Sequence, residues 1–283
     1  MTNPLPADLQ TCVETALAED VGSGDVTAAL VGESTAAEAF VIARERAILC
    51  GRPWFDEVFR QIVPKAELQW IANDGDELTE NQRVVSIRGP AQGLLTAERT
   101  ALNFLQTLSG TATVTAHYAT LVAGTSCRVL DTRKTLPGLR TAQKYAVATG
   151  GGTNHRMGLF DAVLIKENHI TSAGDVAAAI NASRLQNPSL PIEVEVETLE
   201  QLKAALSVGV ERILLDNFSL NLLAEAVALN RGFGPAAAKL EASGNMTEAD
   251  LADVAATGVD YISVGALTKH VRATDYSMRF RFV

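Results

Sequence analysis

Apolar residues between positions 92 and 110 recur with the spacing of one helical face. They are Leu94, Leu95, Ala101, Leu102, Leu105 and Leu108. Spacings of three, four and seven residues predict an amphipathic helix. Before it, a helical stretch at 9–19 is followed by strand-like pieces near 39–51, 66–72 and 83–89. The first part of the chain is therefore expected to form a small α+β layer.

After Gly110 the pattern changes to short apolar runs that alternate with alanine-rich amphipathic stretches. The runs are rich in Val, Ile and Leu, and they read CRVLDTR, DAVLIKEN, IEVEVET, RILLDN, KLEASGN and YISVGA. This composition is typical of parallel strands covered on both faces. The alternation is the βα pattern, and a sheet with this many units most often closes into a barrel. A doubly wound open sheet is the alternative, but no GxGxxG motif follows the first run.

Polar residues stand where each apolar run ends. In a βα barrel the carboxyl ends of the strands meet at one mouth, which carries the active site. A single charged residue in such a place is usually only solvated. The series as a whole favours one anion-binding site, formed by Asp131, Arg133, Lys134, Lys166, Glu195, Asp216, Ser243–Asn245 and Gly265.

The chemistry of these residues indicates a small substrate with several negative charges. Arginine grips carboxylates or phosphates with a planar fork, and lysine supplies a point charge. Glu195 and Asp216 suit Mg²⁺ held together with substrate phosphates, or the hydroxyls of a ribose. The small residues of LEASGN and SVGA let backbone amides approach a phosphate. Because His155 and Arg156 precede the DAVLIK run, we predict that 153–157 is a short strand that turns at Gly158.

Composition limits the classes of partner. The chain has 283 residues, a formal net charge of −9 and a pI near 5.0, which argues against a broad nucleic-acid surface. A basic leader and an apolar run of about 18 residues are both missing, so we expect a cytoplasmic protein that does not enter a membrane. The three cysteines form no CxxC pair, so neither a disulfide framework nor a cysteine zinc site is indicated.

Long motifs of the chain resemble the quinolinate phosphoribosyltransferase family, also called nicotinate-nucleotide pyrophosphorylase (carboxylating). They are EDVGSGDVT, ERTALNFLQTLSGTAT, LDTRKTLPGLR, KYAVATGGGTNHRMGLFDAVLIKENHI, IEVEVET, LLDN, LEASGN and ISVGA. The resemblance implies a glycosyltransferase of NAD biosynthesis. Its reaction joins quinolinate to 5-phosphoribosyl-1-pyrophosphate and gives nicotinate mononucleotide, pyrophosphate and CO₂.

The resemblance also implies an architecture. An N-terminal α/β sandwich would span 1–110, and a C-terminal strand at 274–283 would return to it. An incomplete, seven-stranded TIM-like α/β barrel would span 111–273. The six apolar runs and the short strand at 153–157 together agree with that number of strands.

The resemblance further implies roles for individual residues. Arg99 would reach the neighbouring subunit's site in a homodimer. Catalytic roles would fall to Lys166, Glu195 and Asp216, the two acids also holding Mg²⁺ through the substrate. The substrate pocket would be lined by Arg99, Thr132, Arg133, Lys134, His155, Arg156, Lys166, Glu195 and Asp216. A phosphate would be cradled by Ser243, Gly244, Asn245, Val264, Gly265 and Ala266.

Other functions stay open on the sequence alone. A transferase that uses nicotinate would meet one carboxylate and leave some of these cations unpaired, and CO₂ release separates the two reactions. A barrel aldolase would use Lys166 as a Schiff-base nucleophile. A non-catalytic anion-binding protein is the remaining alternative.

Overall fold

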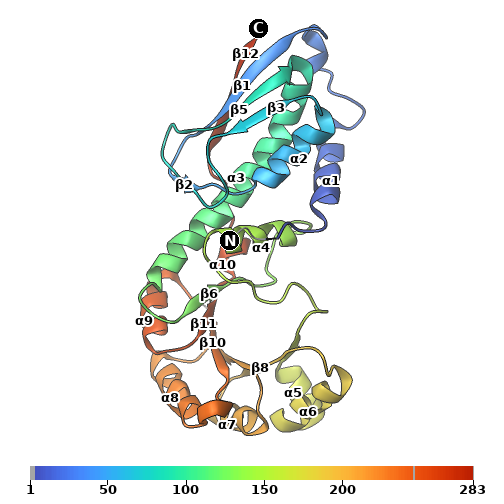
Figure 1. Ribbon diagram of the computed structural model, residues 1–283. Helices are drawn as coiled ribbons and strands as arrows, with labels where there is room; N and C mark the ends of the chain where they lie inside the picture. The colour runs from blue at the N-terminus through green and yellow to red at the C-terminus, as the bar shows by residue number, and fades with distance from the viewer. Residues whose placement is uncertain (1–3, 245, 283) are drawn as a thin grey trace. The chain divides into compact units, whose positions relative to one another are not determined.

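The computed structural model describes residues 4–244 and 246–282 of the chain (Figure 1). The chain folds into two compact units. The first contains the residues up to Ala116, Thr135–Gly151 and the residues from Ala266 onward. The second contains His117–Lys134 and Gly152–Gly265. Neither unit's described part has a helix with the length and apolar character needed to cross a membrane.

The first unit is built on an antiparallel sheet of four strands in the order β12-β1-β5-β3. Their bounds are β1 Ala36–Ala43, β3 Glu67–Trp70, β5 Arg83–Pro90 and β12 Tyr276–Phe282. Alternate residues of β1 are buried, as expected for a strand with one face on a core. The C-terminal residues, expected to return to the first domain, form the edge strand β12 beside β1. A small pair, β2 (Ala47–Ile48) and β4 (Glu77–Leu78), completes the strands described in this unit.

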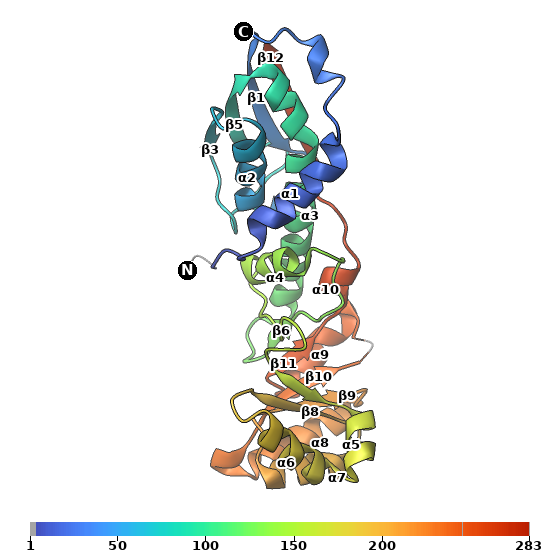
Figure 2. The same ribbon diagram turned by 90° about the vertical axis from the view of Figure 1, so that its right-hand side faces the viewer.

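The first unit also contains helices, of which α1, α2 and the first part of α3 lie against this sheet (Figures 1 and 2) and supply most of the core. Their bounds are α1 Leu9–Val21, η1 Ala28–Leu30, α2 Arg52–Ile62, α3 Ala91–Leu121, α4 Arg140–Thr149 and α10 Ala266–Lys269. The buried face of α2 carries Trp54, Phe55, Val58 and Phe59. Gly51 precedes α2 with φ of 110°, and an added Cβ would lie 3.3 Å from Leu105 and Leu108. Glycine therefore serves the close approach of α2 to α3.

The helix expected at 92–110 extends much further than the pattern indicates. It is the single helix α3, Ala91–Leu121, so the boundary expected at residue 110 falls inside a helix. Thr111, Ala112 and Thr115 continue its buried face. Gly110 lies inside the helix, and its lack of a side chain admits the Arg272 backbone, since a Cβ there would clash with the carbonyl oxygen of Arg272.

The second unit contains a parallel sheet of six strands in the order β6-β11-β10-β9-β8-β7. Each apolar run of the sequence forms one of them: β6 Arg128–Leu130, β7 Val163–Ile165, β8 Ile192–Val196, β9 Arg212–Asp216, β10 Lys239–Ser243 and β11 Tyr261–Ser263. The intervening helices are α5 Glu167–Ala173, α6 Val176–Gln186, α7 Leu199–Val208, α8 Leu220–Arg231 and α9 Leu251–Ala256, with the short turns η2 Gly234–Ala236 and η3 Glu248–Asp250. Asp175, Thr198 and Ser219 cap α6, α7 and α8 with their side-chain oxygens.

The segment 153–157 forms a single bridge where a short strand was expected. Thr153 pairs in parallel with Leu130, next to β6. Beyond it, the N–H groups of His155 and Met157 donate to the side chains of Asp131 and Asp161, which replace a neighbouring strand as acceptors. The structure confirms the α/β class with a parallel βα sheet and a separate antiparallel sheet. Within the described residues the parallel sheet has six strands where seven were expected.

Candidate active site

The predicted polar residues of the second unit lie along the carboxyl edge of its parallel sheet. Glu195 is the fourth residue of β8, and Asp216 and Ser243 are the last residues of β9 and β10. The register places Asp216 opposite Ser243. Lys166 directly follows β7. Because the strands are parallel, these side chains are presented at one edge, as the order of the runs predicted.

Lys166 and Glu195 form an ion pair between neighbouring strands. Lys166 Nζ donates to Glu195 Oε2 at 2.6 Å. The lysine side chain is half exposed, whereas the carboxylate is mostly covered. This charge-assisted hydrogen bond holds the Lys166 side chain beside an acid at the carboxyl edge of the sheet.

The ends of β9 and β10 are fixed to each other by Asn217. This residue has a left-handed backbone, with φ of 55°, and its Nδ2 donates to Asp216 Oδ2 at 2.8 Å. Its backbone N–H donates to the Ser243 carbonyl at 2.9 Å. Gly244 has φ of 137°, and an added Cβ would lie 2.6 Å from Asn217 Oδ1. Asn245, predicted in the same loop, lies outside the described residues.

The loop after β11 lies beside the loop after β6. Val264 N–H donates to the Leu130 carbonyl at 2.9 Å. An added Cβ on Gly265 would lie 3.0 Å from Lys134 Cδ and 3.7 Å from Thr132 Oγ1. The absent side chain at Gly265 therefore leaves room for Lys134, so the structure brings a predicted phosphate loop next to a predicted cation.

Arg156, one of the predicted arginines of this unit, is partly buried. Burial, and after it the charge of the neighbouring Arg133, lowers the pKa of Arg156. Arg156 Nη1 donates to the Ala162 carbonyl at 3.3 Å, which fixes its direction. The carboxylates of Glu193 and Asp161 act on Arg156 in the opposite direction. Arg156 lines a cavity with Ile192, Arg212 and Lys239, the first residues of β8, β9 and β10, so the structure places it at the amino edge of the sheet and not with the Lys166–Glu195 pair. Of the remaining predicted residues, Arg99 is exposed on α3, and Ala266 begins α10, both in the first unit.

Two family models match nearly the whole chain. The description "Quinolinate phosphoribosyl transferase, C-terminal domain" matches residues 111–279, and the corresponding N-terminal domain matches residues 25–109. The chain belongs to the quinolinate phosphoribosyl transferase family.

Curated relatives and solved structures agree with membership of the quinolinate phosphoribosyl transferase family. A nicotinate-nucleotide pyrophosphorylase (carboxylating) of Mycobacterium leprae is 43% identical, covering 94% of this chain and 95% of its own length. A probable enzyme of the same name from Synechocystis is 42% identical, covering 93% of this chain and 89% of its own. The nicotinate-nucleotide pyrophosphorylase structure from Francisella tularensis has a TM-score of 0.94 at 44% identity, covering 99% of both chains.

A more distant structure shares the fold alone. Human nicotinic acid phosphoribosyltransferase has a TM-score of 0.65 at 15% identity, covering 95% of this chain and 73% of its own. This likeness shows that the quinolinate phosphoribosyl transferase fold extends to a protein with a different named substrate.

Two buried acids that the sequence motifs did not indicate, Glu193 and Glu241, lie beside the predicted residue His155. His155 Nε2 is 2.9 Å from Glu193 Oε2 and 3.5 Å from Glu241 Oε2, and Arg212 Nη1 is 3.6 Å from Glu241 Oε2. Glu193 is two residues before Glu195, so strand periodicity puts both on one face. The two-residue period of a strand was therefore the sequence feature that could have indicated Glu193. For Glu241 the signal was its position in the KLEAS strand, where an acid must face the interior or the helices.

His155 and these two acids have the ligand types of a metal centre. Ligand atoms of His155, Glu193 and Glu241 lie within 4.8 Å of one another. However, His155 Nδ1 accepts the Arg156 backbone N–H at 2.7 Å, so the ring hydrogen is on Nε2 and is donated to Glu193. Burial, and then the neighbouring Glu193, raises the pKa of Glu241 well above its usual range. The His155 ring is therefore held by Glu193 and by the Arg156 backbone, with the buried Glu241 beside it.

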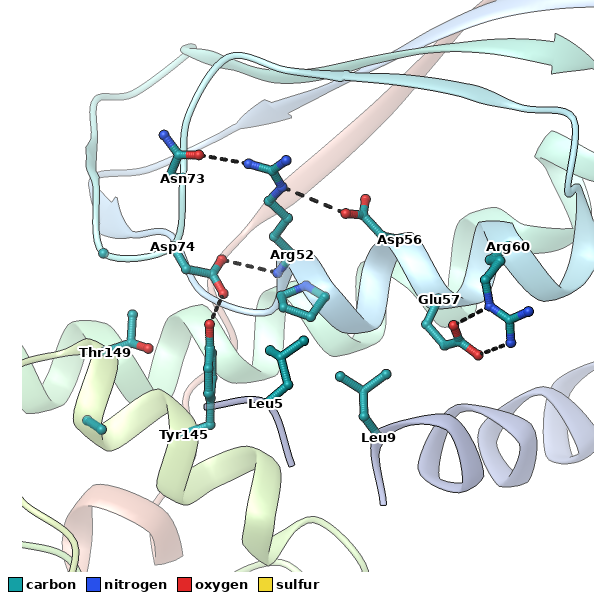
Figure 3. Close-up of a pocket in the computed structure, with 13 residues that line it drawn as sticks. Leu5, Leu9, Arg52, Asp56, Glu57, Arg60, Asn73, Asp74, Tyr145 and Thr149 are labelled. Atoms are coloured by element: carbon teal, nitrogen blue, oxygen red, sulfur yellow. Dashed lines mark hydrogen bonds and ion pairs between the residues drawn. The ribbon is translucent and has the colours of Figure 1, made fainter. Parts of the chain in front are cut away.

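A large cavity of the first unit contains none of the predicted site residues (Figure 3). Its volume is about 1070 Å³. Its charged groups are paired with one another, as Glu57 with Arg60 at 2.5 Å and Arg52 with Asp56 at 3.7 Å. Asp74 accepts the Tyr145 hydroxyl at 2.9 Å. Because these pairs satisfy each other, nothing in the cavity selects a charged ligand, and we assign it no role.

Proposed function

We propose that this chain transfers a phosphoribosyl group from 5-phosphoribosyl-1-pyrophosphate to quinolinate, with loss of CO₂. The products are nicotinate mononucleotide, pyrophosphate and CO₂, and the step belongs to NAD biosynthesis. The observation that carries the proposal is the Lys166–Glu195 ion pair at the carboxyl edge of the parallel sheet, next to the strand ends that present Asp216 and Ser243. Family membership and the names of the curated relatives support it.

The cations bind and orient the pyridine dicarboxylate. Arg133 supplies a fork for a carboxylate, and Lys134 and Lys166 supply further positive charge. With both carboxylates fixed, the ring nitrogen faces the anomeric carbon of the ribose. Positioning of this kind provides a large part of the rate enhancement in a two-substrate reaction. His155 itself is held by its N–H bond to Asp131 and by Glu193.

Glu195 and Asp216 act on the sugar. As the bond to pyrophosphate lengthens, positive charge develops at the anomeric carbon, and nearby carboxylates stabilise it. They are oxygen donors of the type that binds Mg²⁺ jointly with substrate phosphates, so the residues present fit that ion. When bound, Mg²⁺ supplies positive charge that favours the departure of pyrophosphate. The loops at Ser243–Gly244 and Gly265–Ala266 would hold phosphate through backbone N–H groups, whereas the Val264 N–H is already donated to the Leu130 carbonyl.

Loss of CO₂ follows from the charge on the ring. Bond formation at the ring nitrogen makes the pyridine positive. The adjacent C–C bond then breaks, CO₂ leaves, and its electron pair stays on the ring carbon, where the nitrogen's charge stabilises it. A proton then completes the nicotinate ring. The two-carboxylate substrate is thus required by the chemistry as well as by the number of cations.

We further propose that the enzyme works as a homodimer in which Arg99 enters the neighbouring subunit's site. Arg99 is exposed on α3 and has Glu98 as a charged neighbour. An exposed arginine within the ERT motif is available to a second copy of the chain. The same residue would add a fourth cation to the dicarboxylate pocket.

The direct test supplies purified protein with quinolinate, 5-phosphoribosyl-1-pyrophosphate and Mg²⁺. We expect equal amounts of CO₂ and nicotinate mononucleotide, and no product when EDTA removes Mg²⁺. Nicotinate in place of quinolinate separates the alternative transferase, since that enzyme would form the mononucleotide without CO₂. Absence of CO₂ with quinolinate, together with turnover of nicotinate, would overturn the proposal.

A further inference from the structure

The segment after α1 is tied to α3 by a row of three hydrogen bonds. Gln92 Nε2 donates to the Val31 carbonyl at 2.5 Å, Thr96 Oγ1 to Asp25 Oδ2 at 2.9 Å and Thr100 Oγ1 to Asp20 Oδ2 at 3.2 Å. Residues 92, 96 and 100 are spaced by four, so they form one row along the helix surface. Figures 1 and 2 both show this part of the chain running beside α3 towards β1.

Asp25 is the central connection of this row. Its Oδ1 accepts the backbone N–H groups of Thr27 and Ala28, both at 2.9 Å, at the start of η1. Its Oδ2 accepts the Thr96 hydroxyl. One carboxylate thus shapes the turn of its own segment and fixes that turn to α3. These hydrogen bonds lower the pKa of Asp25, and the bond from the Ala28 N–H has the largest effect.

Arg99 lies at the side of the same row. At 100° per residue, it is about 20° around the helix from Gln92 and about 60° from Thr96. Its side chain is exposed, whereas Thr100, the next residue, is buried. The segment fixed beside it carries two apolar side chains, Val26 and Leu30, each 85% exposed. Arg99 on α3 and the two apolar side chains on the segment after α1 are therefore exposed on two elements that the three hydrogen bonds join.

We propose that Asp25 is a positioning residue for Arg99. By holding residues 22–31 along α3, it presents Arg99, Val26 and Leu30 as one preformed surface to a second copy of this chain. The inference rests on the proposed function, in which Arg99 serves the neighbouring subunit's site. Arginine has many rotamers and an unsupported loop has many conformations, so prior ordering reduces the entropy lost when the subunits and substrate meet.

The test changes the hydroxyl of Thr96, which is not among the predicted substrate-binding residues and which donates to Asp25. Thr96→Val removes the donor to Asp25, and Thr96→Ser keeps it. We expect Thr96→Val to raise KM for quinolinate roughly 3–10-fold with kcat nearly unchanged, and Thr96→Ser to match the wild type. A second pair of measurements makes the same change in an Arg99→Ala background, where Thr96→Val should add nothing. Equal effects of Thr96→Val with and without Arg99 would overturn the proposal, as would an unchanged KM.

A second measurement does not depend on turnover. Val26→Ser and Leu30→Ser alter exposed side chains, so they leave the fold intact, and sedimentation should show a dimer dissociation constant raised several-fold in both. Thr96→Val should raise it too, and Thr96→Ser should not. Unchanged dimer dissociation in all three variants would contradict the proposed surface. Failure of the proposed function is a distinct result, because the wild type would then form no CO₂ from quinolinate.

Discussion

Lys166 and Glu195 are joined at 2.6 Å although 29 residues separate them in the chain. One follows β7 and the other is the fourth residue of β8, the next strand of the parallel sheet. In the proposed reaction, the pair sets a cation that binds the substrate beside an acid that acts on the sugar. Each residue therefore controls the position of the other as well as its own contact.

Removing either member of this pair is expected to reduce turnover. Lys166→Ala and Glu195→Ala should each lower kcat/KM for quinolinate by roughly 10²–10³, because each removes charge stabilisation from the reacting groups. The double variant should lose less than the product of the two effects, since each single change also releases its partner. Steady-state kinetics on the four proteins measures this coupling. Lys203→Ala, an exposed lysine on α7, is the control and should behave as the wild type.

Mixing two inactive proteins tests whether Arg99 serves a neighbouring subunit. In a mixed dimer of Arg99→Ala and Lys166→Ala chains, one site would combine the intact Lys166 of one chain with the intact Arg99 of the other. After random exchange of equal amounts, about one quarter of all sites should be active. Each variant incubated with itself is the control. No recovery, with mixed dimers confirmed by mass spectrometry of differently tagged chains, would rule out sharing.

Gly244→Ala is expected to disturb the loop after β10. The new Cβ would lie 2.6 Å from Asn217 Oδ1, on a backbone with φ of 137°. We expect a loss of about 1–3 kcal/mol in the free energy of unfolding and a higher KM for 5-phosphoribosyl-1-pyrophosphate. Gly174→Ala is a matched control, because its φ is 101° but no atom lies within 4 Å of the added Cβ. If both variants change stability and KM alike, the contact with Asn217 has no special effect.

The buried carboxyl of Glu241 should make stability depend on pH. Its pKa is raised by burial and by Glu193, so the folded state keeps a proton that the unfolded state releases above the ordinary value of 4.5. Stability associated with this proton is present below pH 4.5 and is lost as pH rises towards the folded pKa, by at most about 1.4 kcal/mol per pH unit.

Glu241→Gln removes this titration and keeps a neutral side chain of similar shape. The variant's midpoint of thermal unfolding should therefore rise relative to the wild type between pH 5 and pH 8. Glu225→Gln changes an exposed residue on α8, so its difference in unfolding midpoint from the wild type should not vary with pH. Parallel curves for Glu241→Gln and the wild type would show that Glu241 does not hold a proton.

Local sequence patterns predicted the strands well where a short apolar run is bounded by polar residues. Each apolar run became one strand, because a strand covered on both faces needs a short continuous apolar segment. The segment 153–157 shows the limit of this reasoning. Its partners are carboxylates from Asp131 and Asp161, and no local pattern indicates that side chains will replace a neighbouring strand.

The end of α3 shows a second limit. Gly110 reads locally as a break, yet the helix continues to Leu121, and the glycine admits the Arg272 backbone, 162 residues further along the chain. The connection of Asp25 to Thr96 has the same character, because it joins residues 71 positions apart.

The order of residue types along the chain thus determined the α/β class, the six strands and the edge at which Lys166, Glu195 and Asp216 gather. Strand and helix periods are local, and parallel strands necessarily present their carboxyl ends together. Tertiary structure alone decided which of these side chains pair, that Glu193 and Glu241 lie beside His155, and that α3 passes Gly110 without a break. Those outcomes depend on contacts between distant residues, which packing and burial select and which spacing along the chain does not record.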